Sequence, residues 1–362
     1  MKILHLTSMD LLCPTSGITY VLSNLMLEQN KIPGIESHVL AFYKIGDTIY
    51  EGFGAILENE FDRYLVVLNP DLVIIHSFYY ISYIKAAKCL RDRNIPYFLE
   101  PHGAFGKNAM KKSKLKKIIA NATIFRSLIK KSSGIIYLID AEKRDTNYNS
   151  NISAVIPNGI NINTVEVSAS KPPLVTPEIY FLGRYDMHHK GLDYMFGALR
   201  ILDSKGMDFV FKMYGRGSKD QEDYINNNIA NLRHIKAYNC GAILGCEKKK
   251  ALEQANILLL TSRYEGFPMA ILDSFCYGNP CIVTPGTNVI EEVEKNGLGW
   301  ATQLDEQTIA NTIINAIQDY QVHYEEYYRK CKEYVLENYS WEKIAQLSIR
   351  EYKRMLNNNV LK

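Results

Sequence analysis

Short apolar runs alternate with stretches of helical periodicity along nearly the whole chain, and this alternation occurs in two successive series. Runs that are apolar on both faces and lie between helices predict a parallel sheet covered on both sides. Two such series predict two Rossmann-like, doubly wound α/β domains. The predicted strands are 2–7, 37–43, 71–77, 96–103, 134–140 and 153–159, then 178–184, 208–215, 234–239, 257–262 and 280–286.

A segment rich in Ser, Thr and Pro, 161–177, separates the two series and lacks helical periodicity, so we interpret it as a linker and hinge. The predicted domains are therefore 1–165 and 172–340, which suits a chain of 362 residues. Residues 341–357 have an apolar stripe at helical spacing after Ser340, a suitable N-cap. We expect this last helix to pack back on the first domain.

The composition narrows the class of protein. A net charge of +3, with 47% apolar and 22% charged residues, is ordinary for a soluble enzyme and indicates no nucleic-acid partner. The seven cysteines form no CxxC pair, which favours reduced thiols in a cytoplasmic protein over disulfides or structural zinc. His5 and Asp10 interrupt the first apolar run, so we expect a strand there and not a signal peptide. The longest apolar stretch, 71–84, is too short and too polar to span a bilayer.

Two cations follow the first strand of the second series, in the sequence FLGRYDMHHKG. Arg184 and Lys190 stand at the carboxyl end of that strand, where open α/β sheets bind ligands. Together they suit an anion such as a diphosphate; the alternative is two solvated surface cations. His188 and His189 do not suggest a metal site, because adjacent side chains rarely point at one ion and no carboxylate cluster surrounds them in the sequence.

Gly215 and Gly217 follow the next strand and allow close approach of a ligand or of another backbone. A plain tight turn explains this G-x-G equally well.

The sequence SRYEGFPMAILDSFCYGNP places two carboxylates beside a helix N-terminus. Glu265 lies in the turn after a buried strand, Pro268 suits the first helical position, and Asp273 lies just over two helical turns beyond Glu265 on roughly the same side. Amides at this helix N-terminus can donate to an anion or to hydroxyls. They are those of Gly266, Phe267, Met269 and Ala270. Acceptors flanking anion-binding amides fit a nucleotide sugar. Taken singly, Glu265 is also explained as a helix-dipole partner and Asp273 as an exposed helical residue.

The motifs GRYDMHHKG, GRG, SRYEGFPMAILD and GNPCIVT have the order and spacing seen in family 4 retaining glycosyltransferases. The resemblance extends over most of the chain, since PNGIN is similar to the interdomain segment of that family and SWEKIAQ to its closing helix. It implies the GT-B arrangement, in which two Rossmann-like domains face a cleft. The PHG sequence at 101–103 resembles enzymes that build bacterial surface polysaccharides.

The resemblance implies a role for each of these residues in the second half. Glu265 would contact hydroxyls of the donor sugar, and Arg184 and Lys190 would hold the donor diphosphate. Asp273 replaces the second Glu of the family motif, which binds ribose hydroxyls; the carboxylate is kept and its reach is one methylene shorter.

In the first half, PTSGITYVLSNL resembles the glycine loop of the family that faces the diphosphate and the acceptor. The family often has two glycines there, whereas close approach in this chain depends on Gly17 alone. His102 matches a histidine that the family places beside the donor sugar, although a lone histidine is often only a structural residue.

The expected reaction transfers a glycosyl group from a nucleotide sugar, with UDP favoured by family frequency, to an acceptor hydroxyl with retention of configuration. His102, Arg184, Lys190 and Glu265 are the predicted catalytic residues, and no metal or other cofactor is expected because no DxD-like carboxylate pair is present. Base contacts are expected near 238–243. The alternatives are a non-catalytic nucleotide-sugar binder or regulatory partner, and a sugar-nucleotide epimerase of the same architecture.

Residues 107–131 carry nine Lys or Arg and no acidic residue, with apolar residues at helical spacing. They predict an amphipathic helix with a basic flank. It could be an ordinary helix with a solvated basic face, or a surface that binds anionic lipid. The second interpretation predicts a cytoplasmic enzyme, peripheral at the inner face of the cell membrane, with a glycan or lipid-linked acceptor.

Overall fold

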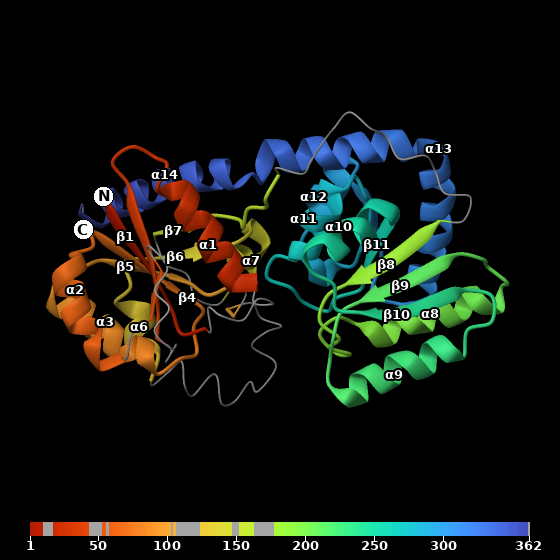
Figure 1. Cartoon of the computed structure of the whole chain (residues 1–362), viewed down its shortest axis with the longest axis horizontal. Coiled ribbons are helices and arrows are strands. Elements are labelled where there is room, and N and C mark those ends of the chain that lie inside the picture. Colours follow the sequence, from red (N-terminus) through yellow and green to blue (C-terminus); the bar gives the residue numbers. More distant parts are fainter. Residues whose placement is uncertain are drawn as a thin grey trace. The chain divides into compact units, whose positions relative to one another are not determined.

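The computed structural model describes residues 1–9, 17–42, 53–55, 58–102, 104–105, 124–146, 152–162 and 177–360. It divides the chain into two compact units, and most of their helices and strands are labelled in Figure 1. The first unit comprises Met1–Gly159 and Ser340–Lys362, and the second comprises Ile160–Tyr339. Most of the predicted linker lies outside the described residues, and the predicted cleft between two domains stays a prediction.

The first unit contains a parallel sheet of seven strands in the order β3-β2-β1-β4-β5-β6-β7. The chain order of these strands reverses between β1 and β4, which makes their carboxyl ends the switch point where such sheets bind ligands. The strands are β1 (Lys2–Thr7), β2 (Glu36–Ala41), β3 (Phe53–Ala55), β4 (Leu72–His76), β5 (Tyr97–Glu100), β6 (Gly134–Tyr137) and β7 (Ser153–Val155).

Helices cover both faces of this sheet. One core contains side chains of α2 (Phe61–Leu68), α3 (Ser82–Asp92) and α6 (Arg126–Lys130). The opposite core contains side chains of α1 (Gly17–Gln29) and of α14 (Trp341–Val360), and α7 (Asp140–Asp145) follows β6. The last helix of the chain is therefore a layer of the first unit.

The packing of α14 on the first unit is close. Trp341 and Met355 are buried, and a Cβ at Gly159 or Gly134 would lie 2.5 Å from a side-chain atom of Trp341 or Met355, respectively. Ser340 caps the helix, since its Oγ accepts a hydrogen bond of 3.3 Å from the Lys343 amide.

The second unit contains a parallel sheet of six strands in the order β10-β9-β8-β11-β12-β13, with its switch point between β8 and β11. The strands are β8 (Glu178–Leu182), β9 (Val210–Tyr214), β10 (Lys236–Gly241), β11 (Ile257–Leu260), β12 (Cys281–Val283) and β13 (Gly299–Ala301). Its helices are α8 (Leu192–Ser204), α9 (Lys219–Ala230), α10 (Gly245–Gln254), α11 (Met269–Cys276), α12 (Ile290–Asn296) and α13 (Glu306–Asn338), the last interrupted by non-helical dihedrals at His323.

The prediction of two doubly wound, parallel α/β folds is confirmed. The structure adds β3 and β13, two strands of three residues each that the sequence did not indicate. Within the described part of the chain, no helix is long and apolar enough to cross a membrane.

Candidate functional site

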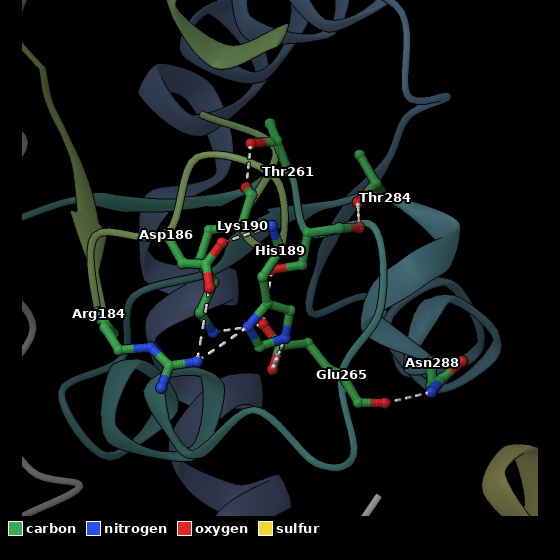
Figure 2. Close-up of polar contacts among 9 residues, drawn as sticks. Arg184, Asp186, His189, Lys190, Thr261, Glu265, Thr284 and Asn288 are labelled. Atoms are coloured by element: carbon green, nitrogen blue, oxygen red, sulfur yellow. Dashed lines mark hydrogen bonds and ion pairs between the residues drawn. The ribbon is translucent and has the colours of Figure 1, made fainter. Parts of the chain in front are cut away.

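The candidate site of the second unit lies at the carboxyl ends of β8 and β11, the neighbouring strands of the switch point. The loop after β8 carries Arg184, His189 and Lys190, and the loop after β11 carries Glu265. Figure 2 shows these side chains together. The parallel sheet thus places residues far apart in the sequence at one edge.

Lys190 and Glu265 form the central contact of the site. Their side chains are 13% and 9% exposed, and the Lys190 ammonium donates to Glu265 Oε1. Ser262 Oγ donates to the same oxygen over 2.6 Å, and His189 Nε2 lies 3.7 Å from Glu265 Oε2. Because a buried carboxylate is costly without partners, these contacts offset part of the cost of burying Glu265.

His189 connects Arg184 to Glu265. Arg184 can only donate, so its contact of 3.4 Å makes His189 Nδ1 the acceptor and leaves the proton on Nε2, toward Glu265. The imidazole stacks on Tyr264 with ring centroids 4.3 Å apart, and burial lowers the pKa of His189 despite the nearby carboxylate. A neutral His189 therefore orients both ends of the site.

Backbone contacts fix the two loops against each other. The Arg263 amide donates to the His189 carbonyl over 2.9 Å, and Thr261 Oγ1 lies 3.0 Å from the carbonyls of Lys190 and Gly191. Gly191 has a φ of 61°, and a Cβ there would lie 2.0 Å from the Thr261 carbonyl oxygen. Only glycine meets both requirements.

Arg184 differs from Lys190 in its exposure. Its side chain is 69% exposed, and its guanidinium lies 3.8 Å from Asp186 Oδ2. It lines an open pocket of about 400 Å³ together with Tyr185, Asp186, Arg216, Gly217, Ser218 and Gln221. The pocket lies between the loops after β8 and β9, so the structure adds Arg216 as a second cation there.

The close approach at Gly215 and Gly217 is made by another backbone. A Cβ at Gly215 would lie 1.9 Å from the Gly183 carbonyl oxygen, and one at Gly217 would lie 2.7 Å from the Tyr185 carbonyl oxygen. The Gly215 amide already donates to the Gly241 carbonyl over 2.9 Å. These glycines therefore let the loops after β8 and β9 pack together, and their predicted donor contacts stay predictions.

The predicted amides lie at the N-terminus of α11. Pro268 was predicted to be the first helical residue. The helix instead begins at Met269, and Pro268 is its N-cap. Gly266, Met269 and Ala270 are half-buried, whereas the Phe267 ring is buried and stacks on Tyr339 with centroids 5.6 Å apart. The first amides of a helix have no partner within it, so those of Met269 and Ala270 keep their capacity to donate.

Asp273 contacts a different cation. Its Oδ2 lies 2.6 Å from Lys248 Nζ on α10, and the side chain is 20% exposed. Burial raises the pKa of Asp273, and Lys248 partly offsets this effect. Asp273 is thus neither a bare carboxylate nor an exposed helical residue. The Lys248 contact was missed in the sequence, where the run EKKKALEQ reads only as a charged helix.

In the first unit, Gly17 begins α1, and no described atom lies within 4 Å of a Cβ built on it. Nothing described therefore requires glycine there. His102 follows β5 in a left-handed conformation, with a φ of 49°. Its Nε2 lies 3.0 Å from His76 Nδ1 and 3.4 Å from Glu100 Oε1. Among the described residues, His76, Glu100 and His102 are the group whose geometry could hold a metal ion, with ligand atoms within 4.8 Å of one another.

Two further predictions concern the basic segment and the cysteines; the first falls largely outside the described residues. Of the basic segment 107–131, the structure describes only residues 124–131, where α6 buries Leu128. The six cysteines that it describes are free thiols.

The second unit is thus a Rossmann-like domain with a cationic and carboxylate site at its switch point. Comparison with known proteins agrees: residues 176–319 match the family model described as Glycosyl transferases group 1. The resemblance inferred from the motifs of the second half is therefore confirmed for the segment that contains this site.

Two relatives and one solved structure illustrate the similarity. An uncharacterized glycosyltransferase of Methanocaldococcus jannaschii is 29% identical over 48% of this chain and 44% of its own length. The amylovoran biosynthesis glycosyltransferase AmsK of Erwinia amylovora is 29% identical over 36% of this chain and 33% of its own length. The chain therefore spans less than half of each relative. The crystal structure of Anabaena HepE in complex with UDP-glucose has a TM-score of 0.73 at 16% identity, covering 98% of this chain and 100% of that one, which shows the fold.

Proposed function

We propose that the protein is a retaining glycosyltransferase. Its donor is a sugar linked to a nucleoside diphosphate, which we propose to be UDP. The observation that carries the proposal is the contact of Lys190 and Glu265 at the switch point, within the segment that matches the family model. A cation and a carboxylate held side by side provide one group for phosphate and one for sugar hydroxyls. The UDP-glucose in the HepE structure supports the choice of carrier.

In this proposal, negative charge develops on the outer phosphate of the leaving nucleoside diphosphate as the glycosidic bond breaks. Lys190 and Arg184 stabilise that charge, since charge-assisted hydrogen bonds contribute about 1.5–3 kcal/mol each. The acceptor oxygen forms the new bond on the same face of the sugar, and the leaving phosphate takes its proton. Glu265 positions the sugar through its hydroxyls.

The donor class is tested by a thermal-shift panel of UDP, GDP, ADP and their sugars. A ligand at 100 times its Kd stabilises a protein by about 2.7 kcal/mol, so the UDP compounds should raise the Tm measurably. Stabilisation by none of the nucleotides would refute the proposal. Stabilisation without transfer to any sugar acceptor would identify a binding protein.

Asp273→Ala tests the ribose role. If Asp273 binds ribose hydroxyls, the contact is equally present in the ground and transition states, so the variant should raise the donor Kd about tenfold and leave saturated turnover nearly unchanged. Lys248→Met is the matched variant, because it removes the partner of Asp273 and keeps the carboxylate. An unchanged donor Kd in Asp273→Ala would leave Asp273 as a structural partner of Lys248.

We further propose that transfer needs no divalent metal, because Arg184 and Lys190 supply the positive charge that a metal would supply at the diphosphate. Treatment with EDTA is expected to leave the transfer rate within about twofold of the untreated rate. Loss of activity that Mg²⁺ or Mn²⁺ restores would contradict this prediction.

The acceptor is proposed to be a surface glycan or its lipid-linked precursor at an anionic membrane, which the name of the Erwinia relative supports. The basic residues of 107–131 would bind the membrane with about 1 kcal/mol each. Co-sedimentation with vesicles containing anionic lipid should fade as salt is added. It should fall sharply when Lys111, Lys112, Lys114, Lys116 and Lys117 become Gln. Binding unaffected by these changes would leave the segment without a membrane role.

A further inference from the structure

Three histidines of the first unit form a line of hydrogen bonds from its interior to the edge of its sheet. His5 and His76 are fully buried on β1 and β4, and the His102 side chain, which follows β5, is 13% exposed. His5 Nδ1 lies 2.8 Å from His76 Nε2, and His76 Nδ1 lies 3.0 Å from His102 Nε2. Each contact joins two ring nitrogens, so one nitrogen of each pair must carry the proton.

The inner end of the line determines which nitrogens carry protons. Ser348 Oγ donates to the Ala345 carbonyl over 2.7 Å within α14, so its oxygen is left to accept from Gln29 Nε2 over 2.8 Å. Gln29 Oε1 must then face the other way, toward His5 Nε2 at 2.9 Å. An amide oxygen can only accept, which places the His5 proton on Nε2.

The position of the His5 proton determines which nitrogens of His76 and His102 are protonated. A neutral His5 with its proton on Nε2 has an accepting Nδ1, so the adjacent proton belongs to His76 Nε2. By the same logic, His76 Nδ1 accepts and His102 carries its proton on Nε2. Burial lowers the pKa of His5 to about 4 and that of His102 to about 4, and it lowers the pKa of His76 as well, so all three rings are neutral near pH 7.

The outer end of the line is therefore His102 Nδ1, a bare acceptor. No described residue hydrogen-bonds to it, and His102 is the only one of the three rings with solvent exposure. Its left-handed backbone, uncommon for a residue other than glycine, adds strain of the kind often found at functional positions.

We propose that Ser348, Gln29, His5, His76 and His102 form a histidine relay that fixes His102 as the Nε2–H tautomer and presents its Nδ1 to a hydroxyl of the donor sugar. The part about the hydroxyl rests on the proposed function. Gln29, His5 and His76 are positioning residues, since they act on the substrate only through His102. The relay predicts that a residue three hydrogen bonds away, Gln29, determines which kind of partner His102 binds.

Histidine ¹⁵N NMR of the full chain tests the relay without any ligand. His5, His76 and His102 should each show a protonated Nε2 and an unprotonated Nδ1, with signals assigned from single histidine variants. A protonated Nδ1 at any of the three would overturn the relay, as would a bound divalent metal that leaves His76 Nδ1 and His102 Nε2 both unprotonated.

Two variants next to each other provide the matched comparison. Gln29→Met removes the acceptor that orders the line, so His102 should become a mixture of tautomers. Ser37 Oγ is buried and donates to the same Gln29 oxygen over 2.7 Å. Ser37→Ala removes this donor but keeps the Gln29 oxygen facing His5, so the tautomers should not change. A single Nε2–H tautomer of His102 in folded Gln29→Met would overturn the relay. If Gln29→Met does not fold, the histidine tautomers of the parent protein still test whether the relay exists.

Binding of UDP and UDP-glucose tests the contact with the sugar. Gln29→Met should weaken UDP-glucose binding about 2- to 10-fold, the value of one hydrogen bond, and leave UDP binding unchanged. Ser37→Ala should change neither. Equal loss for both ligands, or no loss, would refute the hydroxyl contact. A parent protein that binds no nucleotide sugar would refute the proposed function and the hydroxyl contact, while NMR would still decide the relay.

Discussion

Lys190→Met should lower the rate of glycosyl transfer about 100-fold, the equivalent of one strong charge-assisted hydrogen bond to the leaving phosphate. The same change should destabilise the second unit by about 3 kcal/mol, because the nearly buried Glu265 carboxyl would lose its main partner. Transfer assays and denaturant unfolding measure the two effects separately.

A double variant separates catalysis from stability. In Lys190→Met/Glu265→Gln no uncompensated charge remains, so most of the lost stability should return while transfer stays at or below the level of either single variant. Lys205→Met, which removes an exposed lysine after α8, is the control and should change neither quantity. Recovery of transfer in the double variant would show that the pair serves the fold alone.

Gly191→Ala should destabilise the second unit by at least about 3 kcal/mol, because the new Cβ would lie 2.0 Å from the Thr261 carbonyl oxygen in a left-handed backbone. Any relaxation would displace Lys190 and break its backbone contacts with Thr261, so donor binding should be lost as well. The measurements are the free energy of unfolding and the donor Kd.

Gly206→Ala provides the matched control for this prediction. Gly206 also has a positive φ, of 71°, but no atom lies within 4 Å of its Cβ position. It should therefore show only the conformational cost of about 1 kcal/mol and normal donor binding. Similar losses in the two variants would mean that the contact with Thr261 contributes little.

The sequence predicted the parts of the molecule that depend on local order. Apolar runs identified eleven of the thirteen strands that the structure describes. The turn after β11 identified Glu265. Both signals are contained within a few consecutive residues. Lys190 was predicted to lie at an anion site because it follows the carboxyl end of a strand, where open α/β sheets bind ligands. Its contact with Glu265, across 75 residues of sequence, was not predicted.

The remaining features depend on which residues the fold brings together. His5 and His76 are 71 residues apart and meet because β1 and β4 are neighbours. Lys248 reaches Asp273 from another helix, and Gly215 is glycine because a second loop passes beside it. None of these contacts has a sequence pattern, since the spacing between partners is set by the sheet order and not by a helical or strand period.

The first unit takes a layer of its core from α14, and this has a consequence for the order of folding during protein synthesis. On the ribosome, residues up to Gly159 emerge without the Trp341 and Met355 side chains that cover one face of their sheet. The second unit is continuous in sequence and can fold first. At about 5–20 residues per second, translation of the intervening residues leaves that apolar face exposed for roughly 10–40 s. We therefore expect the nascent first half to be the stage at which this protein depends most on chaperones.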